Sequence, residues 1–270
     1  MRQLHLKLLI SFVLVAIAGA ACSTSPTGRS QVILKSDEEL AVEASRQFVE
    51  MKANMPLETD RAKIDYIHCV AQAVVAELPP EYRDLDWEMA IFQADSVNAF
   101  AMPGGKIGVM TGILKAAQNQ DQLAAVIGHE IAHVTARHAN ERASRGSFSN
   151  VGVQVAAVLL GGGNQGATYT AYEALQAGAA LGIMLPFSRS QESEADVIGL
   201  EYMAKAGFDP RESVPLWQNM GQEAEEAPAE FLSTHPSSET RIDQLVGQFG
   251  KTLKIYNEAK QAGKTPSCSM

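Results

Sequence analysis

The sequence lacks any apolar run long enough to cross a bilayer, which takes about 20 consecutive residues in a helix. Its apolar stretches at residues 8–18 and 151–160 are much shorter. This absence excludes an architecture built from membrane-spanning helices. The length of 270 residues suits one folded domain with short appendages.

Basic residues are scarce as well. The chain has 22 Lys and Arg against 31 Asp and Glu, which gives a formal net charge of −9. No basic stripe offsets the excess of acids, and an acidic surface repels the phosphate backbone of DNA and RNA. The composition therefore excludes nucleic acid as a partner.

Cysteine is rare, with three residues in the chain. Cys69 and Cys268 could pair in an oxidising compartment and so tie the C-terminal tail, residues 261–270, to an early helix. Cys69 could equally be a small buried apolar residue. The sequence leaves both possibilities open.

The first 21 residues have the composition of a signal peptide. Arg2 and Lys7 precede the apolar stretch at 8–18, and small residues follow it. This order of a basic, an apolar and a small-residue region predicts export, with removal of residues 1–21.

Cys22 follows Gly19-Ala20-Ala21, an arrangement that resembles a bacterial lipobox, in which the cysteine is acylated and becomes the mature N-terminus. The alternative is ordinary cleavage after Ala20. By resemblance to enteric lipoproteins, Ser23 in place of Asp favours the outer membrane. We therefore expect a periplasmic protein, anchored through a lipid on Cys22 and a polar tether at 22–35.

Hydrophobic periodicity and turn residues predict one domain of the α+β class over residues 36–260. Helices are expected at 36–54, 60–78, 119–138, 190–206, 211–225 and 238–259, and strands at 87–92, 97–102 and 106–111. Pro103-Gly104-Gly105 is typical of a turn between antiparallel strands. We therefore expect a small antiparallel sheet next to the helix that begins near residue 119.

That helix carries His129-Glu130-Ile131-Ala132-His133. Residues four apart lie on one helix face, so His129 and His133 can point at one ion. Imidazole nitrogen suits zinc, and a catalytic zinc takes three protein ligands and one open position. Glu130 is turned about 100° from His129, where its carboxylate can act as a general base on the attacking water and then protonate the leaving amine.

A third ligand is needed. The metzincin pattern would place Gly at 136 and His at 139, but Ala136 and Ala139 stand there, which excludes that class. His138 lies about half a turn from His129 on the predicted helix, so we expect it at the surface or in the C-terminal turn of the helix. The third ligand must come from another segment.

The run from Arg189 to Asp196 supplies a carboxylate. Glu192 and Asp196 are four apart on a predicted helix and share a face. Glu192 can therefore bind zinc while Asp196 accepts a hydrogen bond from the outer nitrogen of His129. Glu194 points away from that face and is interpreted as a solvated charge, although it is the rival ligand if the helix phase differs.

These motifs resemble those of the gluzincin family of HtpX, which includes the CAAX prenyl proteases and the periplasmic lipoproteins LoiP and BepA. The resemblance rests on residues 129–133, on Ser-Arg-Ser-Gln-Glu-Ser-Glu-Ala-Asp at 188–196 and on Ala-Gly-Phe-Asp-Pro at 206–210. Shorter matches lie at 26–29, 98–101, 103–105 and 234–236.

The resemblance implies a mainly helical, zincin-like metalloprotease domain with a small antiparallel sheet and one zinc ion. His129, His133 and Glu192 would be the ligands and Glu130 the catalytic acid and base. The chain resembles the periplasmic branch of the family rather than its membrane-embedded members.

Thr234-His235-Pro236 also matches the family. His235 could be a fourth ligand in a resting state, a donor to the oxyanion of the tetrahedral intermediate, or a plain loop histidine. Arg241 on the next helix either reaches the cleft or only pairs with an acid.

Residues 98–102 could form the edge strand along which an extended polypeptide substrate lies, or an ordinary core strand. His68 is interpreted as a partly buried histidine of a helix, not a ligand.

By resemblance to quality-control members of the family, we expect cleavage of misfolded or misassembled cell-envelope proteins. The competing hypothesis is a metal-bound envelope chaperone or adaptor that rarely cuts, although a pure binder has no need of Glu130. In a third hypothesis the enzyme is latent, gated by His235 and by the Gly- and Ala-rich residues 144–186, which are expected to be mobile or packed over the cleft.

Overall fold

The computed structural model describes residues 22–146, 187–226, 231–232, 235 and 239–270. The predicted signal peptide and residues 147–186 of the predicted gating segment lie outside these ranges. The chain divides into two compact units: residues 1–36 with 139–184, and residues 37–138 with 185–270. Among the helices that are described, none is both long and apolar enough to cross a membrane.

The described part of the first unit contains a small hairpin. Strand β1 (Cys22–Thr24) pairs antiparallel with β2 (Ser30–Val32). Arg29, in the turn between them, donates two hydrogen bonds of 2.9 and 2.8 Å to the buried carboxylate of Glu141. The sequence indicated only a polar tether at 22–35, because strands of three residues show no readable alternation.

The second unit contains a three-stranded sheet of β3 (Glu88–Phe92), β4 (Ala99–Met102) and β5 (Lys106–Met110). The spatial order is β3-β5-β4. Strands β4 and β5 are antiparallel, as predicted. The turn between them has positive φ at Gly104 and Gly105, 78° and 77°, a conformation that favours glycine.

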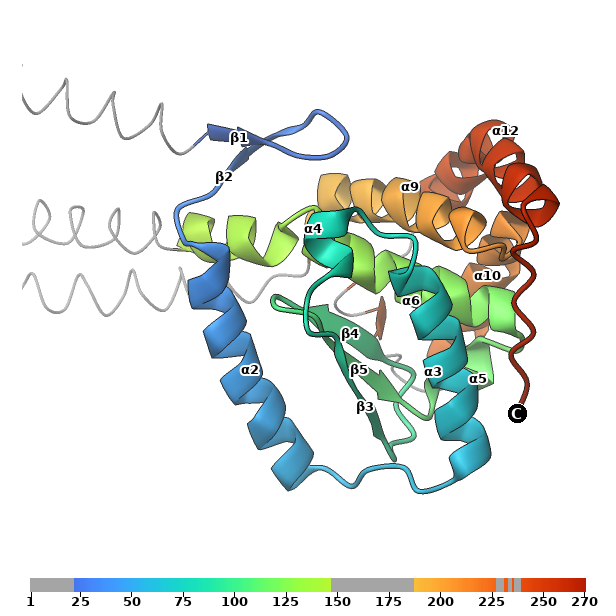
Figure 1. The fold of residues 1–270 in the computed structure, drawn as a ribbon, viewed down its shortest axis with the longest axis horizontal. Coiled ribbons are helices and arrows are strands. Elements are labelled where there is room, and N and C mark those ends of the chain that lie inside the picture. The colour runs from blue at the N-terminus through green and yellow to red at the C-terminus, as the bar shows by residue number, and fades with distance from the viewer. Residues whose placement is uncertain (1–21, 147–186, 227–230, 233–234, 236–238) are drawn as a thin grey trace, which may run out of the picture. The chain divides into compact units, whose positions relative to one another are not determined.

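The prediction of a wholly antiparallel sheet was wrong for the other strand pair. Strand β3 pairs with β5 in parallel, so β5 lies at the centre of a mixed sheet. All five residues of β5 are buried, which fits a strand flanked on both edges. In the sequence, the short connections between the predicted strands favoured hairpins. In the structure, β4 lies along the edge of β5 that faces away from β3 (Figure 1).

Helices make up most of the second unit, which confirms the α+β class and the mainly helical character of the domain. They are α2 (Asp37–Asn54), α3 (Arg61–Val75), α4 (Pro80–Arg83), α5 (Ile113–Ala116), α6 (Gln120–Thr135), α9 (Arg189–Lys205), η1 (Pro210–Glu212), α10 (Ser213–Glu226) and α12 (Glu239–Gln261). Helix α6 begins after Asn119, whose side chain caps it, and α9 begins with a capping box formed by Ser188 and Gln191.

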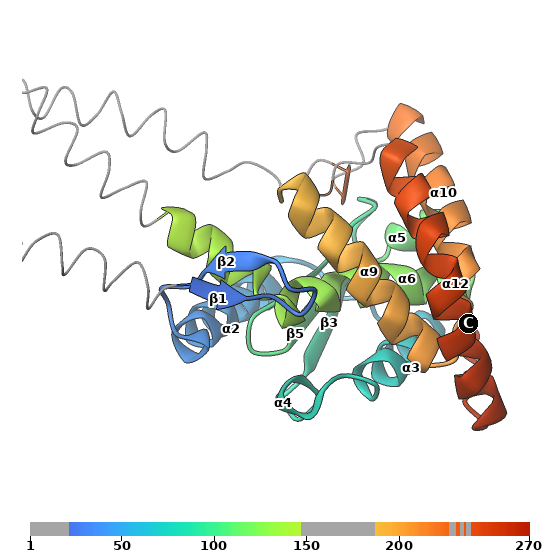
Figure 2. The same cartoon turned by 90° about the horizontal axis from the view of Figure 1, so that it is seen from above.

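Helix α6 is the centre of the second unit. Every residue from Gln122 to Thr135 is buried, and the helix contacts α9, β4 and α3 (Figures 1 and 2). This burial explains why the polar residues of α6 need partners inside the protein. Among them are His129, Glu130 and His133, which the sequence assigned to chemistry.

Helices α6 and α9 touch backbone to backbone at two glycines. A β-carbon on Gly128 would lie 2.9 Å from the carbonyl oxygen of Gly199, and one on Gly199 would lie 2.8 Å from the backbone nitrogen of His129. Any larger residue would therefore force the helices apart. The contact brings Glu192 and Asp196 of α9 within reach of the histidines on α6.

The C-terminal residues are not a loose tail. Cys268 forms a disulfide with Cys69 of α3, which settles the question that the sequence left open. The side chain of Gln120 accepts a hydrogen bond from the backbone of Cys268 at 2.8 Å and donates one to Pro266 at 3.1 Å. The segment is thus fixed to α3 and α6.

The disulfide predicts a measurable loss of stability when it is removed. It closes a loop across a sequence separation of 199 residues, so Cys69→Ser/Cys268→Ser should lower the free energy of unfolding by about 2–5 kcal/mol. Urea unfolding of both proteins, with and without a reductant, measures this. A wild-type midpoint that does not respond to the reductant and equals that of the double variant would contradict the assignment.

Candidate metal centre

Three side chains that the sequence assigned to a metal converge in the structure. His129 and His133 lie one turn apart on α6, with their Nε2 atoms 3.1 Å apart. Glu192 of α9 reaches between them: its carboxylate oxygens lie 3.5 Å from Nε2 of His129 and 3.4 Å from Nε2 of His133. All three side chains are buried.

These separations fit a tetrahedral ion. Zinc binds nitrogen and carboxylate oxygen at about 2.0–2.2 Å, so neighbouring corners of its tetrahedron are about 3.3–3.6 Å apart. The two imidazole nitrogens are 3.1 Å apart, and each lies close to a different oxygen of Glu192: Oε2 is 3.5 Å from His129 and Oε1 is 3.4 Å from His133. Imidazole nitrogen and carboxylate oxygen are also donors that zinc favours. The residues present therefore fit the metal.

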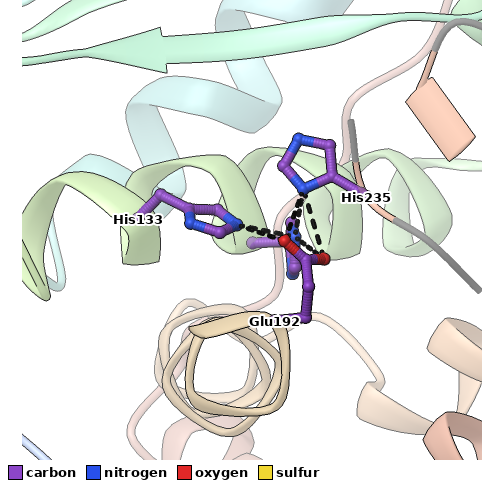
Figure 3. Close-up of side chains that lie close together, drawn as sticks. His133, Glu192 and His235 are labelled. Carbon is purple, nitrogen blue, oxygen red and sulfur yellow. Dashed lines mark hydrogen bonds and ion pairs between the residues drawn. The ribbon is translucent and has the colours of Figure 1, made fainter. Parts of the chain in front are cut away.

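His235 completes the cluster. Its Nδ1 atom lies 3.2 Å from Nε2 of His129 and 3.0 Å from Glu192, and the ligand atoms of all four residues lie within 4.8 Å of one another. Figure 3 shows His133, Glu192 and His235 pointing toward one another from separate segments. The structure thus brings His235 to the site and places it at a fourth corner.

Two further predicted residues hold the outer side of His129. Asp196 Oδ1 accepts a hydrogen bond from Nδ1 of His129 at 3.0 Å, as the shared helix face predicted. Arg241 of α12 donates to both oxygens of Asp196, at 2.5 and 2.8 Å, and pairs with Glu192 at 2.9 Å. Its guanidinium also lies 3.8 Å from the centre of the Trp217 ring. Arg241 is therefore the buried cation that two acids share.

Glu130 faces the cluster with an unsatisfied atom. Its Oε1 is buried and makes no hydrogen bond to any residue that the structure describes, and His235 Nε2 lies 3.4 Å away. Burial raises the pKa of Glu130, and the electrostatic attraction of His235 and His129 for its carboxylate offsets only part of this rise. A buried polar atom without a partner is uncommon and points to a missing partner, such as a water or substrate.

Asp196, Glu192 and His133 have the protonation states that metal binding needs, whereas His129 carries an additional proton. Burial would raise the pKa of both Asp196 and Glu192. Arg241 and His129 outweigh it for Asp196, and His129 and His235 outweigh it for Glu192, so the pKa of each carboxyl group is lowered and both are ionised. Burial and the neighbouring His129 lower the pKa of His133 well below its ordinary value. Burial acts the same way on His129, but hydrogen bonds to Asp196 and Glu192 prevail and raise its pKa to about 9. A metal would displace that proton.

The predictions for His138 and Glu194 were wrong. His138 was expected at the surface or in the C-terminal turn of the helix and Glu194 in solvent, but His138 lies beyond the end of α6 and both side chains are buried. Nδ1 of His138 lies 2.8 Å from Nδ1 of His133, and its Nε2 lies 3.0 Å from Glu194 Oε2. The reason is a turn: α6 ends at Thr135 and Arg137 has φ 58°, so His138 does not continue the phase of the helix.

No sequence signal marked that turn, since Ala136 and Arg137 are ordinary helix residues and no glycine or proline stands there. The interpretation of His68 agrees with the structure. It lies half-buried on α3, beside a separate cavity lined by Gln72, Trp87 and Met89.

Strand β4 adjoins the site. It is an edge strand that pairs only with β5 among the strands described, and it contacts α6. A hydrogen bond from the backbone N–H of Ala101 lowers the pKa of Glu130 and so favours its ionised form. The predicted substrate strand and the predicted base are therefore neighbours.

The sequence is similar to those of known metalloproteases. Residues 61–248 match the family described as Peptidase family M48. The mitochondrial metalloendopeptidase OMA1 of Arabidopsis thaliana is 36% identical over 184 residues, which are 67% of this chain and 36% of that protein. OMA1 of Schizosaccharomyces pombe is 34% identical over 218 residues, 80% of this chain and 62% of that protein.

A putative beta-barrel assembly-enhancing protease of Vibrio cholerae is 32% identical over 199 residues, 71% of this chain and 40% of that protein. The chain thus spans between 36% and 62% of the length of these three relatives.

Arg241 offers a test of the charge balance. Arg241→Met would leave Asp196 and Glu192 buried without their cation, so the metal-free protein should lose about 3–5 kcal/mol of unfolding free energy. Urea unfolding in the presence of a chelator measures this. Arg211→Met is the matched control, because Arg211 is exposed and pairs with Asp209 at the surface, where little should change. Equal losses in the two variants would refute the role given to Arg241.

Proposed function

Because the chain belongs to Peptidase family M48 and is therefore a metalloprotease, we propose that it is a zinc-dependent endopeptidase whose metal centre is formed by His129, His133 and Glu192. The observation that carries the assignment is that the two imidazoles and the carboxylate converge from two different helices, with nitrogen and oxygen atoms 3.1 to 3.5 Å apart. Zinc held there would act as a Lewis acid toward the scissile carbonyl and make an attacking water more acidic.

Glu130 is the general base in this proposal. Its unsatisfied Oε1 faces the cluster, and burial raises its pKa, so it can take a proton from the attacking water. The same carboxyl group then delivers the proton to the leaving amine. Asp196 and Arg241 keep the ring of His129 in one tautomer and one orientation during this cycle.

The substrate is a polypeptide in extended conformation. The edge of β4 that pairs with none of the described strands can bind it through backbone hydrogen bonds, which gives little preference for particular side chains. Because Ala101 of β4 adjoins Glu130, a peptide on that edge would pass beside the base. This geometry suits an endopeptidase that accepts unfolded segments.

His235 is a resting ligand in this proposal, not a donor to the oxyanion. Its Nδ1 atom occupies the fourth corner, where a catalytic zinc keeps an open position. His235 must therefore leave before substrate is cleaved.

The location and the natural substrates are proposals as well. The basic and apolar residues at 1–21, followed by Cys22, support export and a lipid anchor in the bacterial periplasm, at the outer membrane. There the enzyme would remove misfolded or misassembled envelope proteins. One similar protein is named for beta-barrel assembly and two are named as mitochondrial, so similarity alone does not choose the compartment.

The closed fourth corner also favours a second candidate, a metal-bound envelope chaperone or adaptor that seldom cuts. The buried, unsatisfied Glu130 argues against it, since leaving a carboxylate oxygen unpaired is costly and holding a partner does not require it.

Glu130→Gln separates the two candidates. It keeps the shape of the side chain but removes the base, so cleavage of an unfolded protein such as reduced casein should fall by about 10²–10⁴-fold. The zinc content of the purified protein should stay the same, because Glu130 is not a ligand. Equal cleavage by both proteins, or none by either, would favour the chaperone.

His235→Ala tests the resting-ligand role. Removing the side chain frees the fourth corner, so casein cleavage should rise, while zinc remains bound by the other three residues. Initial rates at matched zinc occupancy measure this. A large fall in rate with zinc retained would instead identify His235 as the donor to the oxyanion.

A further inference from the structure

A series of buried polar side chains, linked by hydrogen bonds, reaches His133 on the side of its ring opposite to the metal centre. It consists of His138, none of whose side chain is exposed, and Glu194, which is also buried. The contacts run from Nδ1 of His133 to Nδ1 of His138 at 2.8 Å, and from Nε2 of His138 to Glu194 at 3.0 Å. The proposed mechanism has not used either residue.

The hydrogen bonds of this series have a direction. Glu194 as a carboxylate can only accept, so the proton between it and His138 sits on Nε2 of His138. A neutral His138 then offers a lone pair at Nδ1, which accepts the Nδ1 proton of His133. His133 in this tautomer has its own lone pair at Nε2, the atom that faces His129 and Glu192.

The opposite direction would harm metal binding. If His138 donated from Nδ1, His133 would have to carry its proton at Nε2, where zinc must bind. The aromatic surroundings also fix the ring: Phe187 stacks on His133 with ring centres 4.1 Å apart and an interplanar angle of 30°. The ring therefore has little freedom to turn its other nitrogen to the metal.

We propose that Glu194 and His138 form a positioning relay that sets the tautomer and orientation of His133 for the metal. The proposal rests on the proposed zinc centre. In this proposal a carboxylate orients each of the two metal-binding histidines. Asp196 binds His129 directly, and Glu194 acts on His133 through the imidazole of His138. Both carboxylates come from α9, where Glu194 and Asp196 follow Glu192 by two and four residues.

The test is zinc affinity, measured on the full-length protein by competition with a chromophoric chelator. His138→Phe/Glu194→Met removes both members of the relay together, so neither is left buried without the other. Affinity should fall about 10–100-fold, as is typical when the outer partner of a metal ligand is lost. With Co²⁺ in place of zinc, the visible absorption bands should also shift, because the orientation of His133 changes.

Glu194→Gln provides a second variant that preserves shape. The amide can either accept from His138 or donate to it, so both directions of the series become possible, and zinc affinity should fall about tenfold. This variant decides the question if the double variant does not fold.

Tyr202→Phe is the matched control. It removes a buried hydrogen bond between α9 and α6, from Tyr202 to Thr135 at 3.1 Å, without touching the cluster. Its stability should fall while its zinc affinity stays at the wild-type value. A purely structural role for the relay would give the same pattern in all variants, with affinity unchanged, and would overturn the proposal.

Glu192→Ala distinguishes failure of the relay from failure of the zinc centre. If this variant binds zinc as tightly as wild type, the proposed centre itself is wrong, and the relay falls with it. If it loses zinc while the relay variants bind as tightly as Tyr202→Phe, only the relay is refuted.

Discussion

The backbone contact between α6 and α9 is the constraint on which the site depends. Gly128 and Gly199 lie at the crossing, and a β-carbon at either position would meet the backbone of the other helix. Because the helices approach this closely, a carboxylate of ordinary length on α9 spans the distance to histidines on α6. The fully buried α6 then holds those histidines in an environment from which water is largely excluded.

Charge balance is the second constraint. Glu192 and Asp196 of α9 are buried beside the histidines, and Arg241 is a buried cation that contacts both. Burying such a group of charges does not stabilise a protein by itself. It is retained because it provides ionised oxygens and a neutral imidazole at one point, the arrangement that a divalent cation requires.

The sequence predicted those parts of the site that depend on a single helix. The four-residue spacings of His129 with His133, and of Glu192 with Asp196, place each pair on one face whatever the tertiary structure. His138 was misjudged because its position depends on a turn at Arg137 that has no sequence marker, and Glu194 was misjudged because its buried partner is His138. The parallel pairing of β3 with β5 was missed for a similar reason, since strand order is a long-range property.

The most direct measurement is an anomalous diffraction map, collected at the zinc edge from crystals of the zinc-loaded protein. The account predicts one strong peak, about 2.0–2.2 Å from His129 Nε2, His133 Nε2 and a carboxylate oxygen of Glu192. A peak elsewhere, or no peak between these three side chains, would contradict it.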